Sequence, residues 1–127
     1  MNYAIKAPDK ISHDSLDELV FMLLFFMRKG LVADMWKRDI SRAFRRLAIA
    51  AEHLHLAWVV FLFHGVRWAA QHLAMPFGSI SAVHAWHRTG AFLLAAVRRL
   101  ALAPAARYVD DFFGASRKAS TGQEVGA

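Results

Sequence analysis

The chain of 127 residues contains no cysteine. This absence excludes a disulfide-stabilised scaffold, a thiolate metal site and a cysteine nucleophile. The sequence also lacks a glycine-rich phosphate-binding loop and a Gly-x-Ser-x-Gly nucleophile turn. The candidate functional groups are therefore carboxylates, histidines and basic side chains.

Long apolar runs are missing as well, although 57% of the residues are hydrophobic. The densest run, residues 19–27, has nine residues, whereas a helix that spans a bilayer needs about 20. The N-terminus lacks the basic and then apolar order of a signal peptide. We therefore expect a soluble, intracellular chain without a membrane partner, and the sequence does not predict its compartment further.

Acidic residues are scarce in the middle of the chain. Residues 37–107 contain ten basic residues and only two acidic ones, Asp39 and Glu52, whereas the flanking segments are close to neutral. Such a basic segment fits a polyanionic partner, either nucleic acid or membrane headgroups. It also fits an ordinary solvated surface, and charge alone does not decide between these interpretations.

Two helices are expected. The first helix begins with a capping box at Ser15 and runs to residue 28, and Gly30 follows as its stop signal. It is apolar nearly all round, which predicts burial. The second begins at Ser79 or Ser81 and continues to residue 100, ahead of Pro104.

The strand signals are shorter. Residues 33–40 are expected to form one strand, residues 54–63 and 66–73 a hairpin with a His64-Gly65 turn, and residues 107–113 a second hairpin with two carboxylates at its tip. Few strands and two long helices predict an α+β fold, with a small antiparallel sheet packed on the helices. The chain beyond Ser116 is small and polar, and we expect it to be disordered.

Three acidic residues stand out by their surroundings, since Asp39 ends a strand and Asp110 and Asp111 are adjacent at a hairpin tip. Carboxylate oxygens brought together in this way suit Mg²⁺, and two such ions can promote phosphoryl transfer. An isolated Asp-Asp pair is more simply a turn, because Asp favours turns.

The neighbouring residues favour the functional interpretation. Residues 36–44 (Trp-Lys-Arg-Asp-Ile-Ser-Arg-Ala-Phe) resemble the first catalytic motif of reverse transcriptases, and residues 75–82 (Met-Pro-Phe-Gly-Ser-Ile-Ser-Ala) resemble the second. Residues 108–111 (Tyr-Val-Asp-Asp) match the third motif in full. The three motifs follow in the right order, and the resemblance covers residues 33–116. The pattern is closer to retroelement polymerases than to retroviral ones.

The resemblance implies a role for each matching position. Asp39, Asp110 and Asp111 would hold Mg²⁺ or Mn²⁺, and Phe44 would crowd a ribose 2′-hydroxyl and so favour deoxynucleoside triphosphates. Backbone amides from Ile40 onward would face the triphosphate, and Tyr108 would lie near the primer end. Pro76, Phe77 and Gly78 would form the floor under the new base pair. The basic residues could neutralise phosphates of an RNA or DNA template and its primer.

The resemblance also implies missing parts, because a working polymerase needs fingers and a thumb. We therefore interpret residues 1–32 as a helical segment like a finger–palm junction, residues 33–116 as a palm-like core and residues 117–127 as a tail. The function expected is that of a reverse transcriptase fragment, inactive until the fingers and thumb of a longer polymerase are supplied. The alternative is a non-catalytic, basic nucleic-acid-binding module derived from a retroelement. A third is a protein that binds membrane surfaces.

Other side chains have simpler interpretations. His84 and His87 are spaced to share a metal ion, but no third ligand accompanies them. His53 and His55 are expected to alternate on a strand and so to point to opposite faces. A further group of large apolar residues is assigned to the core: Met22, Met27, Trp58, Trp68 and Trp86.

Overall fold

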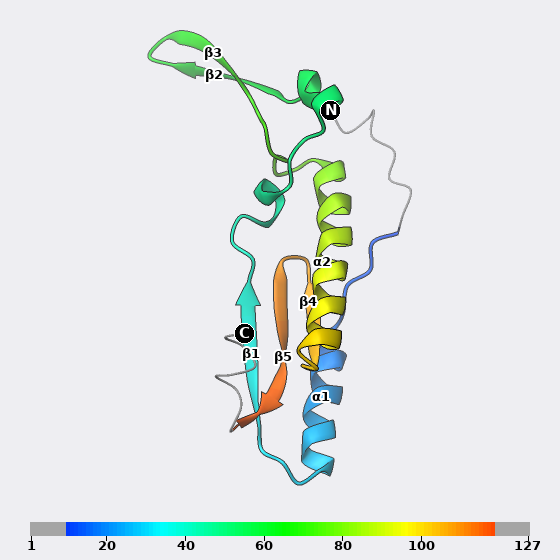
Figure 1. The fold of residues 1–127 in the computed structure, drawn as a ribbon. Helices are drawn as coiled ribbons and strands as arrows, with labels where there is room; N and C mark the ends of the chain where they lie inside the picture. Colours follow the sequence, from blue (N-terminus) through cyan, green and yellow to red (C-terminus); the bar gives the residue numbers. More distant parts are fainter. Residues whose placement is uncertain (1–9, 119–127) are drawn as a thin grey trace. The chain divides into compact units, whose positions relative to one another are not determined.

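The computed structural model describes residues 10–118 and divides the chain into two compact units (Figure 1). One, here called the sheet unit, contains Ile11–Ser41 and His87–Ala127. The other, the hairpin unit, contains Met1–Lys10 and Arg42–Trp86. The chain passes between the two units three times, after Lys10, Ser41 and Trp86.

The sheet unit is built on three antiparallel strands. Strand β5 (Asp111–Arg117) is central and pairs with β1 (Ala33–Asp39) on one side and with β4 (Ala105–Tyr108) on the other. Helix α1 (Leu16–Arg28) precedes β1, and helix α2 (Ile80–Leu100) contributes its residues from His87 onward. The predicted strand at 33–40, the long second helix and the final hairpin are confirmed.

The core of the sheet unit lies between the sheet and α2. Leu94 of α2, Ala105 of β4 and Phe112 of β5 form its buried centre, and Trp36 and Ile40 pack against it. Successive residues of a strand point to opposite faces, so Phe112 faces this core while its neighbour Asp111 faces away from it. The face that carries Phe112 therefore packs on α2, and the opposite face carries Asp111.

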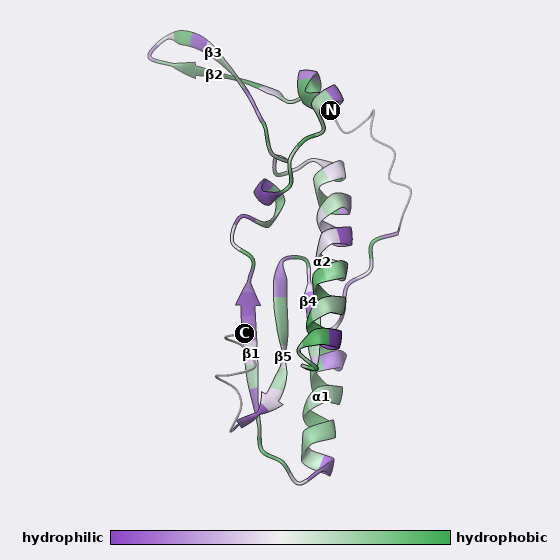
Figure 2. Ribbon diagram, viewed as in Figure 1, coloured by the Kyte–Doolittle hydropathy of each residue, from purple (hydrophilic) through white to green (hydrophobic). Residues whose placement is uncertain are grey.

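Helix α1 begins as its sequence predicts and is exposed where burial was expected. The Ser15 hydroxyl accepts a hydrogen bond from the backbone N–H of Asp17 at 3.1 Å, and the helix ends before Gly30, whose φ is +66°. Only Phe26 is buried, although Figure 2 shows apolar residues along the helix. The expectation of burial is wrong because an apolar sequence does not specify which other element covers the helix. The large exposed residues are Leu16, Val20, Phe21, Leu24, Phe25 and Met27.

The hairpin unit contains β2 (Trp58–Phe63) and β3 (Val66–Gln71). His64 and Gly65 join them with φ values of +48° and +75°, the left-handed pair that a two-residue hairpin turn needs. The predicted hairpin is thus confirmed. Every residue of both strands is exposed, so Trp58 and Trp68 are not core residues; of the predicted core tryptophans only Trp86 is buried.

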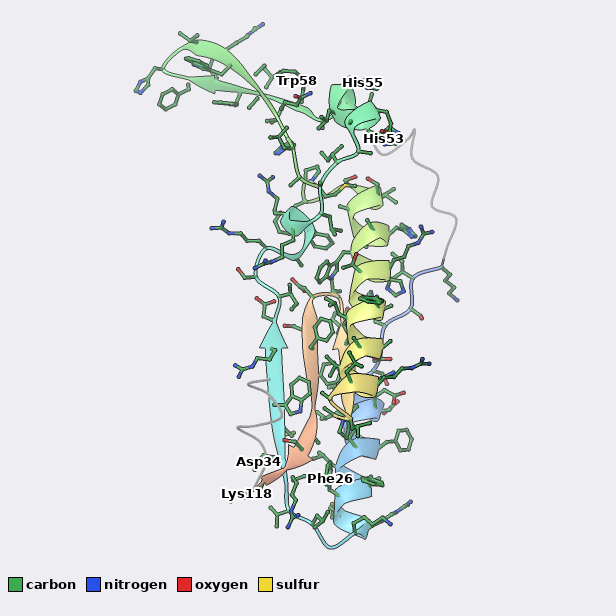
Figure 3. The ribbon with its side chains drawn as sticks, in the orientation of Figure 1. Phe26, Asp34, His53, His55, Trp58 and Lys118 are labelled. Atoms are coloured by element: carbon green, nitrogen blue, oxygen red, sulfur yellow. The ribbon has the colours of Figure 1, made fainter. Side chains whose placement is uncertain are left out.

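The segment ahead of β2 is helical and not extended. Residues Ala51–Leu56 form a 3-10 helix, η3, in which the His53 N–H donates to Ala50 O at 2.9 Å. His53 and His55 lie on this helix, just before Trp58 (Figure 3). The prediction that a strand begins at residue 54 and places the two histidines on opposite faces is therefore wrong.

The fold class is α+β with small antiparallel sheets, as predicted. The division into residues 1–32, 33–116 and 117–127 stays a prediction. Arg117 ends β5 and the Lys118 N–H donates to Val32 O at 3.1 Å, while the rest of the expected tail lies outside the described residues. Across residues 10–118, no helix has both the length and the apolar character to cross a bilayer.

Candidate functional site

The three acidic residues singled out by the sequence lie at one end of the sheet unit. Asp39 is the last residue of β1, and its pairing partner is Asp111, the first residue of β5. The Ile40 N–H donates to Asp110 O at 3.2 Å, which joins the end of β1 to the turn of the β4–β5 hairpin. The pairing register therefore brings together residues from the first and third motifs.

The turn that carries Asp110 has a strained backbone. Tyr108 pairs with Asp111, so Val109 and Asp110 form a two-residue loop, and Val109 has a φ of +54°. A β-branched residue rarely adopts this conformation, which costs about 1–3 kcal/mol. The Arg107 guanidinium donates from Nη1 to Val109 O at 2.6 Å. A buried arginine thus helps to hold the turn in place.

A lysine lies among these carboxylates. The Lys37 ammonium is 2.9 Å from Asp111 Oδ2. Lys37 and Asp39 are two residues apart on β1, and Asp39 is directly opposite Asp111, so all three side chains share one face of the sheet. The hydrogen bond to Asp111 raises the pKa of Lys37, helped by the charges of Asp111, Asp39 and Asp110. Lys37 is therefore the cation of the carboxylate cluster. Sequence reasoning overlooked it, although its place two residues before Asp39 on a strand was a usable signal.

The donor chemistry of this end of the sheet fits a hard divalent cation, because carboxylate oxygens are the ligands that Mg²⁺ and Mn²⁺ prefer. Among residues 10–118, however, no three His, Asp or Glu side chains lie close enough together to hold one ion. The Lys37 ammonium, paired with Asp111, supplies positive charge at this end of the sheet. The backbone thus gathers Asp39, Asp110 and Asp111, while their side chains do not converge on a single point.

A cavity of about 370 Å³ opens beside the ion pair, between α1 and the face of the sheet that carries Asp111. Its polar lining consists of Lys37, Asp111 and Tyr108, and the rest is mainly apolar. Tyr108, the predicted primer-side residue, is about half exposed and shares the face of its pairing partner Asp111. The remaining lining residues are Leu16, Leu19, Met35, Trp36 and Phe113.

The predicted nucleotide-contacting residues of the first and second motifs meet in the hairpin unit. Phe44 lies on a short 3-10 helix, η2 (Ala43–Arg46), and its ring centroid is 5.4 Å from that of Phe77. Pro76 is half-buried next to it, and Gly78 has a φ of +82°, which favours glycine. Phe44 thus contacts the Pro76-Phe77-Gly78 segment through Phe77; the nucleotide-binding roles of these residues stay predictions. Ile40 and Tyr108 belong to the sheet unit with the three aspartates.

Most of the basic residues expected to contact phosphates are exposed, with one exception. Arg107 is only 4% exposed, because it points from β4 toward α2, where its Nη2 donates to His87 O at 3.3 Å. Arg107 is therefore directed into the protein. His87, considered as a metal ligand, has its Nδ1 3.1 Å from the same Nη2. The exposed arginines that lie close to Asp39 in sequence are Arg38, Arg42, Arg45 and Arg46.

The sequence matches no protein-family model, and no curated protein is significantly similar to it.

Proposed function

We propose that this chain is the palm segment of a reverse transcriptase of the retroelement type. When completed by fingers and a thumb, it would extend a primer on an RNA or DNA template. The proposal rests on the sequence motifs, and one structural observation supports it above others: Asp39 pairs with Asp111, and Ile40 is bonded to Asp110. Motifs far apart in the sequence thereby present three carboxylates at one end of a small sheet.

In this proposal, Asp39, Asp110 and Asp111 hold Mg²⁺ or Mn²⁺. Such ions stabilise the attacking and leaving oxygens of a phosphoryl transfer. The Phe44 ring excludes a ribose 2′-hydroxyl, while Pro76, Phe77 and Gly78 support the base pair and backbone amides from Ile40 onward face the triphosphate. Tyr108 lies near the primer end. Lys37 pairs with Asp111 Oδ2 and so competes with a metal ion for that oxygen.

Primer extension tests this proposal. The full chain would be fused to finger and thumb segments of a retroelement polymerase and assayed with a primed template, deoxynucleotides and Mg²⁺. We expect extension that Asp110→Asn abolishes. Asp34→Asn is the matched control, because it removes the same charge from the opposite end of the same sheet. Extension that persists in Asp110→Asn would contradict the two-metal assignment.

A non-catalytic nucleic-acid-binding module is the second candidate. The observation that favours it is the ion pair between Lys37 and Asp111, since a carboxylate already neutralised by the chain needs no metal ion. Four exposed arginines flank this strand end in sequence: Arg38, Arg42, Arg45 and Arg46.

Binding measurements separate the two candidates. A binding module should retain its affinity for single-stranded RNA without Mg²⁺ and after Asp39→Asn or Asp110→Asn. Replacing the four arginines by glutamine should flatten the slope of log K against log salt by about 3, because each phosphate contact contributes about 0.7. RNA affinity that disappears with the metal or with either aspartate would exclude this candidate.

A further inference from the structure

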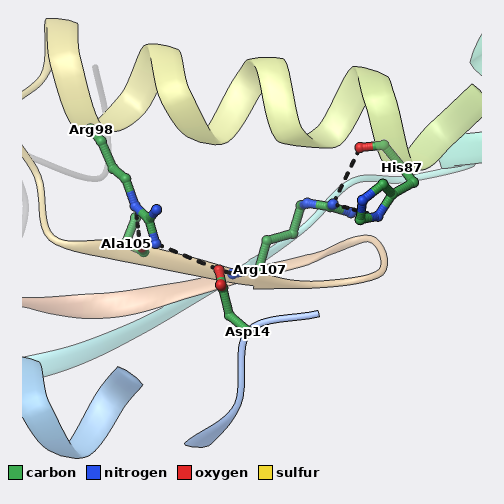
Figure 4. A network of polar contacts seen from close by, with 5 residues as sticks. All are labelled: Asp14, His87, Arg98, Ala105 and Arg107. Carbon is green, nitrogen blue, oxygen red and sulfur yellow. Dashed lines mark hydrogen bonds and ion pairs between the residues drawn. The ribbon is translucent and has the colours of Figure 1, made fainter. Parts of the chain in front are cut away.

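A second charged region lies on the opposite face of the β4–β5 hairpin from the aspartates. A cavity of about 450 Å³ is bounded by α2, by β4 and by the segment that precedes α1. Arg98 reaches from α2 to β4, where its Nε donates to Ala105 O at 2.7 Å, and Arg107 reaches from β4 to α2 (Figure 4). Arg99 also lines the cavity. Guanidinium groups therefore stand on more than one side of it.

The charge in this cavity is unbalanced. Its lining includes the guanidinium groups of Arg98, Arg99 and Arg107 and a single carboxylate, that of Asp14. Asp14 Oδ2 accepts from the Arg107 backbone N–H at 2.9 Å and lies 3.5 Å from Arg98 Nη2. The carboxylate is thus shared between a backbone amide and one arginine, which leaves positive charge in excess.

Arg107 is the strongest sign that an anion belongs here. Arg107 is 4% exposed, and among residues 10–118 the hydrogen bonds of its guanidinium go to neutral acceptors, Val109 O and the carbonyl and ring nitrogen of His87. Its Nε is buried and has no hydrogen-bond partner among the described residues. Burial lowers the pKa of Arg107, and the charge of Asp14 opposes this shift. A buried cation with an unused donor is costly even with Asp14 nearby, and a bound anion would offset that cost.

The position of Arg107 is fixed by a glycine. A β-carbon at Gly90 of α2 would lie 2.8 Å from Arg107 Nη1 and 2.9 Å from its Nε. The guanidinium therefore lies against the bare backbone of the helix, where any other residue would displace it. The close approach of α2 therefore limits where the Arg107 guanidinium can lie beside the cavity.

We propose that this cavity binds a phosphate monoester. Such a group carries a charge of about −1.5 to −2 at pH 7, which matches three guanidinium groups reduced by one carboxylate. The planar donors of arginine suit phosphate oxygens. The cavity falls within the usual size of ligand pockets, about 300–1,000 Å³, and has room for an organic body against Ala91, Leu94 and Ala95. The inference does not depend on the proposed polymerase function.

Calorimetric titration of the full chain tests the proposal, with inorganic phosphate, phenyl phosphate and phenol as probes. We expect phenyl phosphate to bind more tightly than inorganic phosphate, and phenol not to bind. Arg107 is buried, and its removal could unfold the unit, so the exposed Arg99 carries the test. Arg99→Gln should weaken phenyl phosphate about tenfold or more, the usual loss for a charge-assisted hydrogen bond.

Two further variants sharpen the result. Asp14→Asn should tighten binding, because it removes the competing carboxylate from Arg98. Arg88→Gln is the matched control, since Arg88 lies on the same helix and does not line the cavity; its effect should stay within about twofold. Failure of both phosphates to bind at millimolar concentration would overturn the proposal. So would equal losses in Arg88→Gln and Arg99→Gln, which would indicate diffuse attraction.

The source of the phosphate is distinguished by competition. A 5′-phosphorylated oligonucleotide that displaces phenyl phosphate, where its 5′-hydroxyl counterpart does not, identifies the end of a nucleic acid as the ligand. Displacement by a nucleoside 5′-monophosphate alone identifies a free small molecule. Displacement by the 5′-hydroxyl oligonucleotide would count against recognition of a monoester.

Discussion

Gly114 is the most crowded glycine of the sheet unit, and its replacement gives the sharpest stability prediction. It is in the central strand β5, opposite Trp36 of β1 and Ala105 of β4. A β-carbon there would lie 2.8 Å from Cζ2 and 2.9 Å from Cε2 of Trp36, and closer still to the backbone oxygen of Pro104. Backbone held between two strands cannot retreat without breaking the ladder.

The expected magnitude is a balance of two effects. Overpacking in a closed site costs about 1–3 kcal/mol, and contact with both an indole ring and the backbone of Pro104 places Gly114→Ala at the upper end. Alanine also lowers the conformational entropy of the unfolded chain, which stabilises the folded state by about 0.4–1 kcal/mol. We therefore expect the free energy of unfolding to fall by about 2 kcal/mol.

Urea denaturation of the full chain, followed by circular dichroism, measures this loss. Gly90→Ala is the matched control. The three atoms nearest its β-carbon all belong to the end of the Arg107 side chain, which can shift more easily than backbone, and alanine gains about 1 kcal/mol of helix propensity over glycine, so the loss should be smaller than that of Gly114→Ala. A Gly114→Ala variant as stable as the parent, or less affected than Gly90→Ala, would refute the packing argument.

Four other predictions concern the strained turn, the ion pair and the exposed hairpin. Val109→Gly should be neutral or stabilise by up to about 1 kcal/mol because it relieves a positive φ, whereas Val60→Gly in β2 should destabilise; equal losses in denaturation midpoints would contradict this. Lys37→Gln should tighten Mn²⁺ binding measured by electron paramagnetic resonance, and Arg38→Gln, which removes the same charge from the opposite face, should do so less. Because the pKa of Lys37 is raised, its ion pair stabilises the fold below the unfolded pKa of 10.5 and is lost as pH rises through the folded value. A Lys37→Gln variant should therefore show a shallower loss of stability at alkaline pH, and parallel curves would exclude this contribution. Amides of β2 and β3 should exchange at least about tenfold faster than those of β5, since an isolated two-stranded hairpin is marginally stable; equal protection would show a missed packing partner.

Local signals predicted the elements of this fold well. Ser15 and Gly30 mark the ends of α1 because capping and left-handed stops depend on single residues. His64-Gly65 predicted its hairpin for the same reason. The start of β2 was misjudged because the leucines and histidines of residues 53–56 alternate like a strand, whereas their backbone bonds, such as Ala57 N–H to Leu54 O, close helical turns.

Properties that depend on distant partners were less predictable. The sequence singled out Asp39, Asp110 and Asp111, and the register of β1 on β5 brings their backbones together. It did not reveal that Lys37 lies among them, because a side-chain ion pair requires knowledge of that register. The burial of Arg107 was equally hidden, since nothing in the sequence of β4 states which face packs on α2.

Arg107 connects the two charged regions of the sheet unit, and strand alternation explains how. Arg107 and Tyr108 are adjacent on β4 and so point to opposite faces, one toward the arginine-lined cavity and the other toward Asp111. The guanidinium donates from Nη1 to Val109 O and thereby restrains the strained turn that carries Asp110. Its Nε has no hydrogen-bond partner among residues 10–118, so the bond to the turn does not use this donor. The two demands on this side chain are therefore compatible. The burial of Arg107 therefore has a physical reason. Its guanidinium restrains the strained turn at Val109 and, in our proposal, attracts an anion to the arginine-lined cavity.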